Sequence, residues 1–269
     1  MQFNRKLFLI IAIFAMTILV SAQAPAPSDT VLVVAQSTDV TSLDPPQIGS
    51  RPDANIAHHL FSTLYGIDVD GNIFPVLAES YEISEDGTTY TFTLREGLTC
   101  HDGSPLTSDD VAFSFNRAAD PENAFTGNTP GFVYSSMGFV DAESVSELEV
   151  AVNIARRTSI ALGLITEVSI YCRESYDGVP LEETALNPVG SGPYVFVERV
   201  ADDYILMEKW EDYALYDEDQ FETIVWRVIP EASTRVAELI AGNVDIITNV
   251  LPDQHDAVDA SGVAEIQAV

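Results

Sequence analysis

Basic residues are scarce in this chain of 269 residues, which has 12 Lys and Arg against 42 Asp and Glu and a formal charge of −30. Lys209 is the only lysine after residue 22. A chain this acidic repels phosphate backbones and anionic lipid surfaces, so we expect no nucleic-acid partner. Hydrophobic residues make up 46% of the chain, which excludes a disordered acidic tail and allows a sizeable core.

Cysteine is also scarce. Cys100 and Cys172 belong to no CxxC motif and to no Cys/His cluster with metal-ligand spacing, so we expect neither a metal nor another cofactor. An even number of cysteines in an exported chain is compatible with one disulfide. Burial as two free thiols is equally compatible with the sequence.

Long apolar runs are limited to the N-terminus, where residues 7–20 follow Arg5 and Lys6 and precede the small residues Ser21 and Ala22. This order predicts a signal peptide over residues 1–22 and an exported, periplasmic protein. A membrane anchor is the alternative, but the run is too short to span a bilayer comfortably.

The motifs of common catalytic sites are missing. No Gly-x-Ser-x-Gly elbow or HExxH motif is present, and no lysine follows residues 190–192 as a phosphate loop requires. On a helix, His58 and His59 would diverge by about 100° and could not easily share a metal. His101-Asp102-Gly103 is typical of a turn. We therefore expect a protein that is not an enzyme.

A would-be calcium loop over residues 68–79 has Ile73 where the motif needs glycine, so a hairpin turn is the better interpretation. Hairpins are also predicted around residues 84–89 and 201–203. Asp53 is a candidate N-cap for a helix that would end at Gly66. A Thr cap at residue 107 predicts a second helix over residues 111–118.

The order of the other elements predicts the class. A buried strand over residues 31–35 precedes a polar loop over residues 36–52, and residues 125–138 form a long aromatic loop without periodicity. Near the C-terminus, strand 223–229, helix 233–241 and strand 244–249 predict a βαβ unit with a parallel strand pair. We therefore predict an α/β fold, with a mixed sheet, that carries an α+β insertion.

Ligands of open α/β sheets bind beyond the carboxyl ends of the strands. Two polar loops meet this condition, residues 36–52 and residues 248–252, and the aromatic loop with Phe132 and Tyr134 could face them from the insertion. An exported, non-enzymatic chain with such a cleft is typical of a binding protein for a small solute.

Several stretches resemble the extracellular solute-binding proteins of family 5, the peptide/nickel-type receptors of ABC importers. They are Thr41-Ser42-Leu43-Asp44-Pro45, residues 70–80 with 86–97, His101-Asp102-Gly103-Ser104-Pro105-Leu106-Thr107 with Asp109-Asp110-Val111, Asn187-Pro188-Val189-Gly190-Ser191-Gly192-Pro193-Tyr194, and residues 235–247. Together they cover nearly all of residues 30–252.

The resemblance implies a periplasmic-binding-protein-like lobe I formed by residues 23–45 and 176–269, with an inserted α+β domain over residues 46–175. It also implies that a small solute, such as a di- or oligopeptide, binds between two lobes and is passed to an inner-membrane ABC permease. The ligand-binding positions that it implies are Gly49, Ser50, Arg51, Pro52, Phe132, Tyr134, Thr248 and Asn249.

The chain is shorter than members of this family, so we expect a fragment or a truncated reading frame in which the second lobe is missing. A monomer is expected. Receptors for nickel chelates or oligosaccharides, a peptide-binding chaperone or a sensor without a permease are alternative functions. A secreted hydrolase would need a nucleophile–base pair that the sequence does not suggest.

Overall fold

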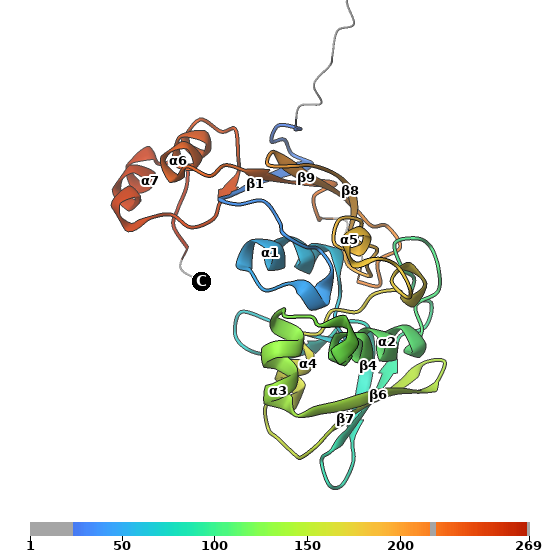
Figure 1. The fold of residues 1–269 in the computed structure, drawn as a ribbon. Coiled ribbons are helices and arrows are strands. Elements are labelled where there is room, and N and C mark those ends of the chain that lie inside the picture. The colour runs from blue at the N-terminus through green and yellow to red at the C-terminus, as the bar shows by residue number, and fades with distance from the viewer. Residues whose placement is uncertain (1–23, 216–218, 268–269) are drawn as a thin grey trace, which may run out of the picture.

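The computed structural model describes residues 24–215 and 219–267, which form two packed units, each built on one sheet (Figure 1). The predicted signal peptide, residues 1–22, lies outside these residues. Within the described part, no helix has both the length and the apolar character needed to cross a bilayer.

The first unit, which we call the five-stranded unit, has the strand order β11-β1-β10-β9-β8. The central strand β1 pairs in parallel with β10 on one side and with β11 on the other, whereas β8, β9 and β10 are antiparallel neighbours. The mixed sheet is therefore confirmed. Its bounds are β1 Val31–Gln36, β8 Tyr194–Val200, β9 Tyr204–Lys209, β10 Thr223–Val228 and β11 Ile246–Ile247.

Side chains alternate along β1, so neighbouring residues point to opposite faces of the sheet. Both faces are buried because helices pack on them. Val34 packs on one face with Ile56 and Leu60 of α1 (Arg51–Leu60), and Val33 packs on the other face, where Leu239 of α6 (Ala232–Ile240) also lies. A strand buried on both faces reads as a continuous apolar run, as residues 31–35 do. The helix α7 (His255–Ser261) lies beside α6 (Figure 1).

The second unit, which we call the four-stranded unit, is an antiparallel sheet of order β4-β5-β7-β6. On β5, Tyr90, Phe92 and Leu94 are buried, alternating with half-buried threonines, and they join a core that α2 and α3 share. Its elements are β4 Ala78–Ile83, β5 Thr89–Leu94, α2 Ser108–Ala119, α3 Tyr134–Met137, β6 Phe139–Ser146, β7 Glu149–Ile154 and α4 Ala161–Ile165, and a small hairpin of β2 Tyr65–Ile67 and β3 Ile73–Pro75 precedes them.

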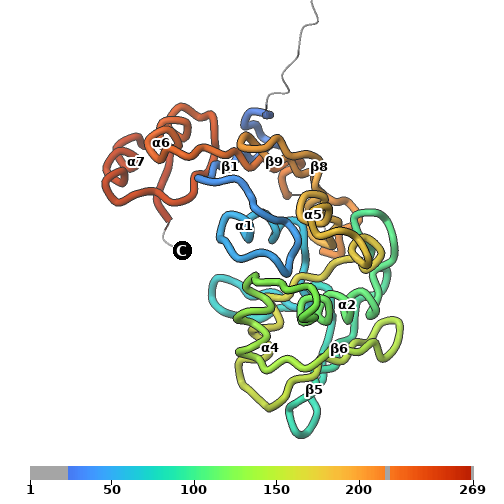
Figure 2. The backbone as a smooth tube through the Cα atoms, viewed as in Figure 1, coloured from blue at the N-terminus to red at the C-terminus, as the bar shows by residue number. Residues whose placement is uncertain are grey.

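The chain leaves the five-stranded unit once and returns once (Figure 2). Short helical segments lie on these connections, in the loops of the second unit and, in the five-stranded unit, between β11 and α7. Their bounds are η1 Pro45–Gln47, η2 Pro121–Asn123, η3 Thr129–Val133, η4 Arg173–Ser175, α5 Leu181–Thr184 and η5 Pro252–Gln254. The domain boundary at residue 46 stays a prediction, but α1 packs on the five-stranded sheet, and the separate core of the four-stranded unit begins at Leu64.

The prediction of the first helix was wrong at both ends. Ser50, not Asp53, is the N-cap of α1, and its hydroxyl accepts a hydrogen bond from the Asp53 amide at 3.2 Å. The helix ends at Leu60, and Gly66 lies in the small β2–β3 hairpin. Asp53 has a long-range partner in Thr41, and short-range cap statistics cannot reveal such a partner.

The C-terminal strand pair needs a second correction. β10 and β11 are both parallel to β1, but β1 lies between them, so they are not neighbours. Residues 31–36, nearly two hundred positions earlier, occupy the middle of the predicted βαβ unit. The strand predicted over residues 244–249 shrinks to Ile246–Ile247 because only two residues pair with β1.

The predicted aromatic loop over residues 125–138 contains a five-residue π-helix, Thr129–Val133, followed by α3. Gly138 ends α3 in the left-handed conformation at φ 74°. The Pro and Gly residues that suggested a loop occupy positions that these short helices tolerate. The hairpins β4–β5 and β8–β9 and the helix α2 with its Thr107–Asp110 capping box are confirmed.

Candidate functional site

Thr248 and Asn249 lie at the carboxyl ends of β1 and β11, as the sequence predicts. The Thr248 amide donates to the Ala35 carbonyl at 2.9 Å, and its hydroxyl lies 3.4 Å from the same oxygen. Asn249 is exposed and has a left-handed backbone at φ 58°. Carboxyl ends of parallel strands are where open α/β sheets bind ligands.

The loop after β1 is held in place by Asp39. Its carboxylate accepts hydrogen bonds from Nε of Arg199 at 3.1 Å and from the Asp202 amide at 2.8 Å. Burial alone would raise the pKa of Asp39, but the hydrogen bonds from Arg199, Asp202 and Val40 outweigh it and lower that pKa. The loop therefore has a fixed, charged attachment to β8.

The next part of the loop is attached to the first turn of α1. The Thr41 amide and hydroxyl donate to the two Asp53 carboxylate oxygens at 2.9 and 2.7 Å. This contact places the N-terminus of α1 beside the loop. Residues 49–51 are exposed there and Pro52 is half-buried, so the predicted ligand loop is accessible apart from the Ser50 hydroxyl, which caps the helix.

The predicted aromatic segment lies against this loop. The amides of Gly127 and Asn128 donate to the carbonyls of Pro46 and Ile48 at 3.2 and 2.8 Å. A Cβ atom on Gly127 would lie 2.7 Å from the Ile48 carbonyl oxygen, so only glycine permits this approach. The structure thus brings residues 49–52 close to the start of the segment that carries Phe132.

The two predicted aromatic residues differ in exposure. Phe132 is 62% exposed, so its ring is available to a solute. Tyr134 is 6% exposed, donates its hydroxyl to the Phe115 carbonyl at 2.9 Å and stacks on Phe139 with the ring centroids 4.3 Å apart. Tyr134 therefore packs in the core of the four-stranded unit and has no free face for a ligand in this conformation.

Asp44 is a joint between the two units whose role sequence reasoning missed. It is fully buried and pairs with Arg117 of α2 through two hydrogen bonds of 2.8 and 2.7 Å. It also accepts from the Thr184 hydroxyl at 2.8 Å. Burial alone would lower the pKa of Arg117, but the Asp44 carboxylate outweighs it and raises that pKa. An Asp-Pro sequence suggests a turn, and nothing local in it reveals the distant arginine.

The His101 turn is a second joint. His101 Nδ1 accepts from the Gly190 amide at 3.2 Å, which leaves Nε2 to donate to the Gly192 carbonyl at 3.0 Å. Desolvation lowers the pKa of His101, in keeping with this neutral ring. Asp102 accepts from the Ser104 amide at 2.9 Å, which is the turn chemistry that the sequence predicts.

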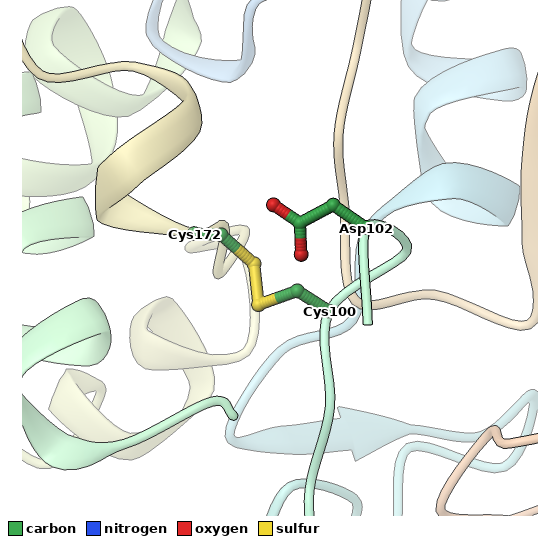
Figure 3. A group of neighbouring side chains, drawn as sticks. All are labelled: Cys100, Asp102 and Cys172. Carbon is green, nitrogen blue, oxygen red and sulfur yellow. A yellow bond between two sulfur atoms is a disulfide. The ribbon is translucent and has the colours of Figure 1, made fainter. Parts of the chain in front are cut away.

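Cys100, in the same turn, is joined to Cys172 by a disulfide, with a Cα–Cα distance of 6.2 Å (Figure 3). The Asp102 carboxylate points toward the two sulfur atoms, and all three side chains offer ligand atoms within 4.8 Å of one another. Because the sulfurs are bonded to each other, they do not provide the thiolates that a soft metal would need.

The stretch from Gly190 to Gly192 packs against the C-terminus of α1. The Gly192 amide donates to the Leu60 carbonyl at 2.9 Å, and a Cβ on Gly192 would lie 2.6 Å from both the His59 oxygen and the Phe61 nitrogen. The intervening Ser191 hydroxyl donates to the Ile170 carbonyl at 2.7 Å. The glycines here serve close backbone packing, in keeping with the interpretation that they form no phosphate loop.

A surface groove of about 560 Å³ lies between α2 and residues 176–181. Its lining includes Phe113, Arg117 and Leu181, but none of the residues predicted to bind ligand. The groove and the carboxyl edge of the five-stranded sheet are therefore separate features.

The family model for "Bacterial extracellular solute-binding proteins, family 5 Middle" matches residues 72–267. The glutathione-binding protein GsiB of Pectobacterium atrosepticum is 31% identical over 216 residues, which are 78% of this chain and 40% of that protein. The chain spans about half the length, or less, of the curated relatives it matches.

Two solved structures are similar in fold. The ABC transporter substrate-binding protein CtaP of Listeria monocytogenes matches with a TM-score of 0.75 and 27% identity, over 86% of this chain and 46% of that one. The periplasmic binding protein DppA of Helicobacter pylori, solved with the peptide STSA, matches with a TM-score of 0.75 and 25% identity, over 86% and 48%. The predicted α/β class with its insertion is thereby confirmed. The chain belongs to the bacterial extracellular solute-binding proteins of family 5.

Proposed function

We propose that this chain is the substrate-binding component of an ABC importer in the periplasm. It binds a small solute, of the di- or oligopeptide class, and delivers it to a membrane permease. The relatives are named for glutathione binding, and one similar structure holds a peptide, which supports this class of ligand. The chain contributes the wall of the binding cleft that the five-stranded unit forms.

The observation that carries the proposal is the position of Thr248 and Asn249. They lie at the carboxyl ends of two strands in the five-stranded sheet, at the edge where α/β sheets bind ligands. Residues 49–52 and Phe132 form a second accessible group, joined by the backbone contacts of residues 46–48 with 127–128. Backbone amides, an amide side chain and an exposed ring are groups that recognise an extended peptide.

A titration followed by NMR tests the proposal. The purified chain is titrated with glutathione, with dialanine and with a tetrapeptide, each to millimolar concentration. We expect saturable shifts of the Thr248 and Asn249 amides and of the Phe132 ring, and weaker binding by the variants Asn249→Ala and Phe132→Ala.

Val140→Ala is the matched control, because Val140 is a large exposed apolar residue on β6 in the four-stranded unit. Its variant should bind as the parent does. If no probe shifts these resonances, or if the shifts map to the groove between α2 and residues 176–181, the proposed site is wrong.

A further inference from the structure

Arg235 is a buried cation at the edge of the proposed site. It lies in the first half of α6 and is 3% exposed. Among the ion pairs of residues 24–215 and 219–267 there is none that includes Arg235. A buried guanidinium without a carboxylate partner is costly unless other acceptors bind its donors.

The guanidinium binds backbone carbonyls from two segments. Nη1 donates to the carbonyls of Ile229 at 2.8 Å and Pro230 at 3.0 Å, just beyond the end of β10. Nη2 lies 3.4 Å from the Asn249 carbonyl, just beyond β11. Arg235 thus ties together the chain where it leaves two strands that lie on opposite sides of β1.

Asn249 has a left-handed backbone, at φ 58°. Asparagine tolerates this region better than most residues, but extended conformations compete with it, so contacts that select the left-handed one fix the direction of the Asn249 backbone. The preceding residue is fixed by the hydrogen bond from the Thr248 amide to Ala35. Arg235 then provides the contact on the far side, at the carbonyl of Asn249 itself.

We propose that Arg235 is a positioning residue of the ligand site, which fixes the backbone of Asn249 against the end of β10 so that Thr248 and Asn249 are held ready for the solute. This inference rests on the proposed function. Arginine suits the task because its planar fork donates in several fixed directions, whereas the single ammonium of lysine cannot span both segments with the same geometry.

The test compares Arg235→Met with Arg227→Met. Arg227 lies on β10 in the same unit, and its Nη1 donates to Glu238 at 3.4 Å. Arg227→Met therefore removes an arginine that has no hydrogen bond to Asn249. In Arg235→Met we expect the Asn249 Cα shift and its amide–Hα coupling to leave the left-handed range and its amide to exchange faster. Binding of the solute probe that the parent chain binds should weaken about tenfold or more. Arg227→Met should change neither.

The melting temperature sets the conditions under which positioning is separated from simple support of the fold. Arg235→Met leaves three backbone carbonyls without this donor, so its melting temperature should fall somewhat, and binding is therefore measured well below that temperature, where the variant is folded. Unchanged binding by the folded variant would overturn the proposal, as would an unchanged conformation of Asn249. If Arg235→Met does not fold, Arg235→Lys serves instead, with a smaller expected loss.

A double variant adds an independent check. Glycine adopts left-handed backbone freely, so in an Asn249→Gly background the further change Arg235→Met should weaken binding less than it does in the parent chain. Equal losses in both backgrounds would contradict the proposal. If the parent binds no probe at all, the proposed function fails, and the Asn249 coupling and exchange still decide whether Arg235 holds that backbone.

Discussion

The two units differ in how far apart along the chain their partners lie. The four-stranded unit pairs β4 with β5 and β6 with β7 through short hairpins, and all its strands come from residues 78–154. The five-stranded unit pairs residues 31–36 with residues 223–228 and 246–247. Local contacts form with a smaller loss of loop entropy, so the four-stranded unit is expected to depend less on the rest of the chain.

The proposed ligand residues follow the same division. Thr248, Asn249 and residues 49–52 depend on the long-range sheet, whereas the exposed Phe132 belongs to the segment of residues 127–134 whose start contacts residues 46–48. A site at the joint between a locally built unit and a non-locally built one depends on the contacts that hold the units together. Those contacts include the Asp44–Arg117 pair and the His101 turn.

The largest expected effect concerns the disulfide, which closes a loop of 72 residues inside the locally built unit. Replacing Cys100 and Cys172 by serine should lower the free energy of unfolding by about 4 kcal/mol, from loop-closure entropy in the unfolded state. Urea unfolding with hydrogen exchange should show β5 and β7 losing protection more than β1 does.

The bond itself is tested by intact mass, which should rise by about two units on reduction. Two titratable thiols in the denatured, unreduced protein would mean that the cysteines are free. Equal loss of protection in both units would mean that they unfold as one.

The next effect concerns the joint. Asp44→Ala leaves Arg117 buried without its carboxylate and should cost about 3 kcal/mol, the lower end for a broken buried pair, because the Tyr171 hydroxyl stays within 3.3 Å. Arg173→Gln, which removes an exposed pair with Asp177, is the control and should cost less than about 1 kcal/mol in urea unfolding.

Replacing both Asp44 and Arg117 by apolar residues should recover much of the stability lost in Asp44→Ala, since no charge then stays unpaired. If Asp44→Ala is as stable as the parent, the pair does not hold the units together.

A pH effect is expected in the five-stranded unit. His59 packs against Tyr194 and Trp226, and desolvation, with a smaller contribution from His58, lowers its pKa from 6.5 to about 4. Between these values the unfolded chain binds the proton on His59 more readily than the folded chain does. His59 therefore lowers the free energy of unfolding as pH falls from 6.5 to 4, and it has little effect on that free energy above pH 6.5.

The expected loss is about 2 kcal/mol, less than the full linkage value because the ring is only partly buried. Urea midpoints at pH 7 and at pH 4.5 measure it. His59→Phe should reduce the dependence and His58→Gln, at an exposed position, should retain it. An identical pH profile in His59→Phe would show that other groups are responsible.

The smallest effect is local. Ser50→Ala removes the N-cap of α1 and should cost about 1 kcal/mol. Ser50→Asp should retain the cap, so its stability in thermal unfolding should match that of the parent. A loss in Ser50→Asp equal to that in Ser50→Ala would show that the N-cap hydrogen bond does not account for the contribution of Ser50 to stability.

Sequence reasoning worked where the signals are local. The β4–β5 and β8–β9 hairpins, the capping box of α2 and the buried run of β1 follow from alternation and turn residues. Sequence reasoning failed where a partner distant along the chain determines the position of a residue. Asp53 turned out to bind Thr41 rather than to cap its own helix, and Tyr134 lies in a core although its neighbour Phe132 is exposed.

By itself the sequence determined the acidic charge of the chain, the family resemblance and the two loops at strand ends, and it predicted export, because charge, leader pattern and turn residues are local properties. Only the tertiary structure decided that β1 separates β10 from β11, that Asp44 joins the two units and that Arg235 contacts Asn249. The first two depend on segments far apart along the chain, and the third joins residues 14 positions apart across α6 and β11. Their energies depend on burial, which arises only when the separate segments pack together.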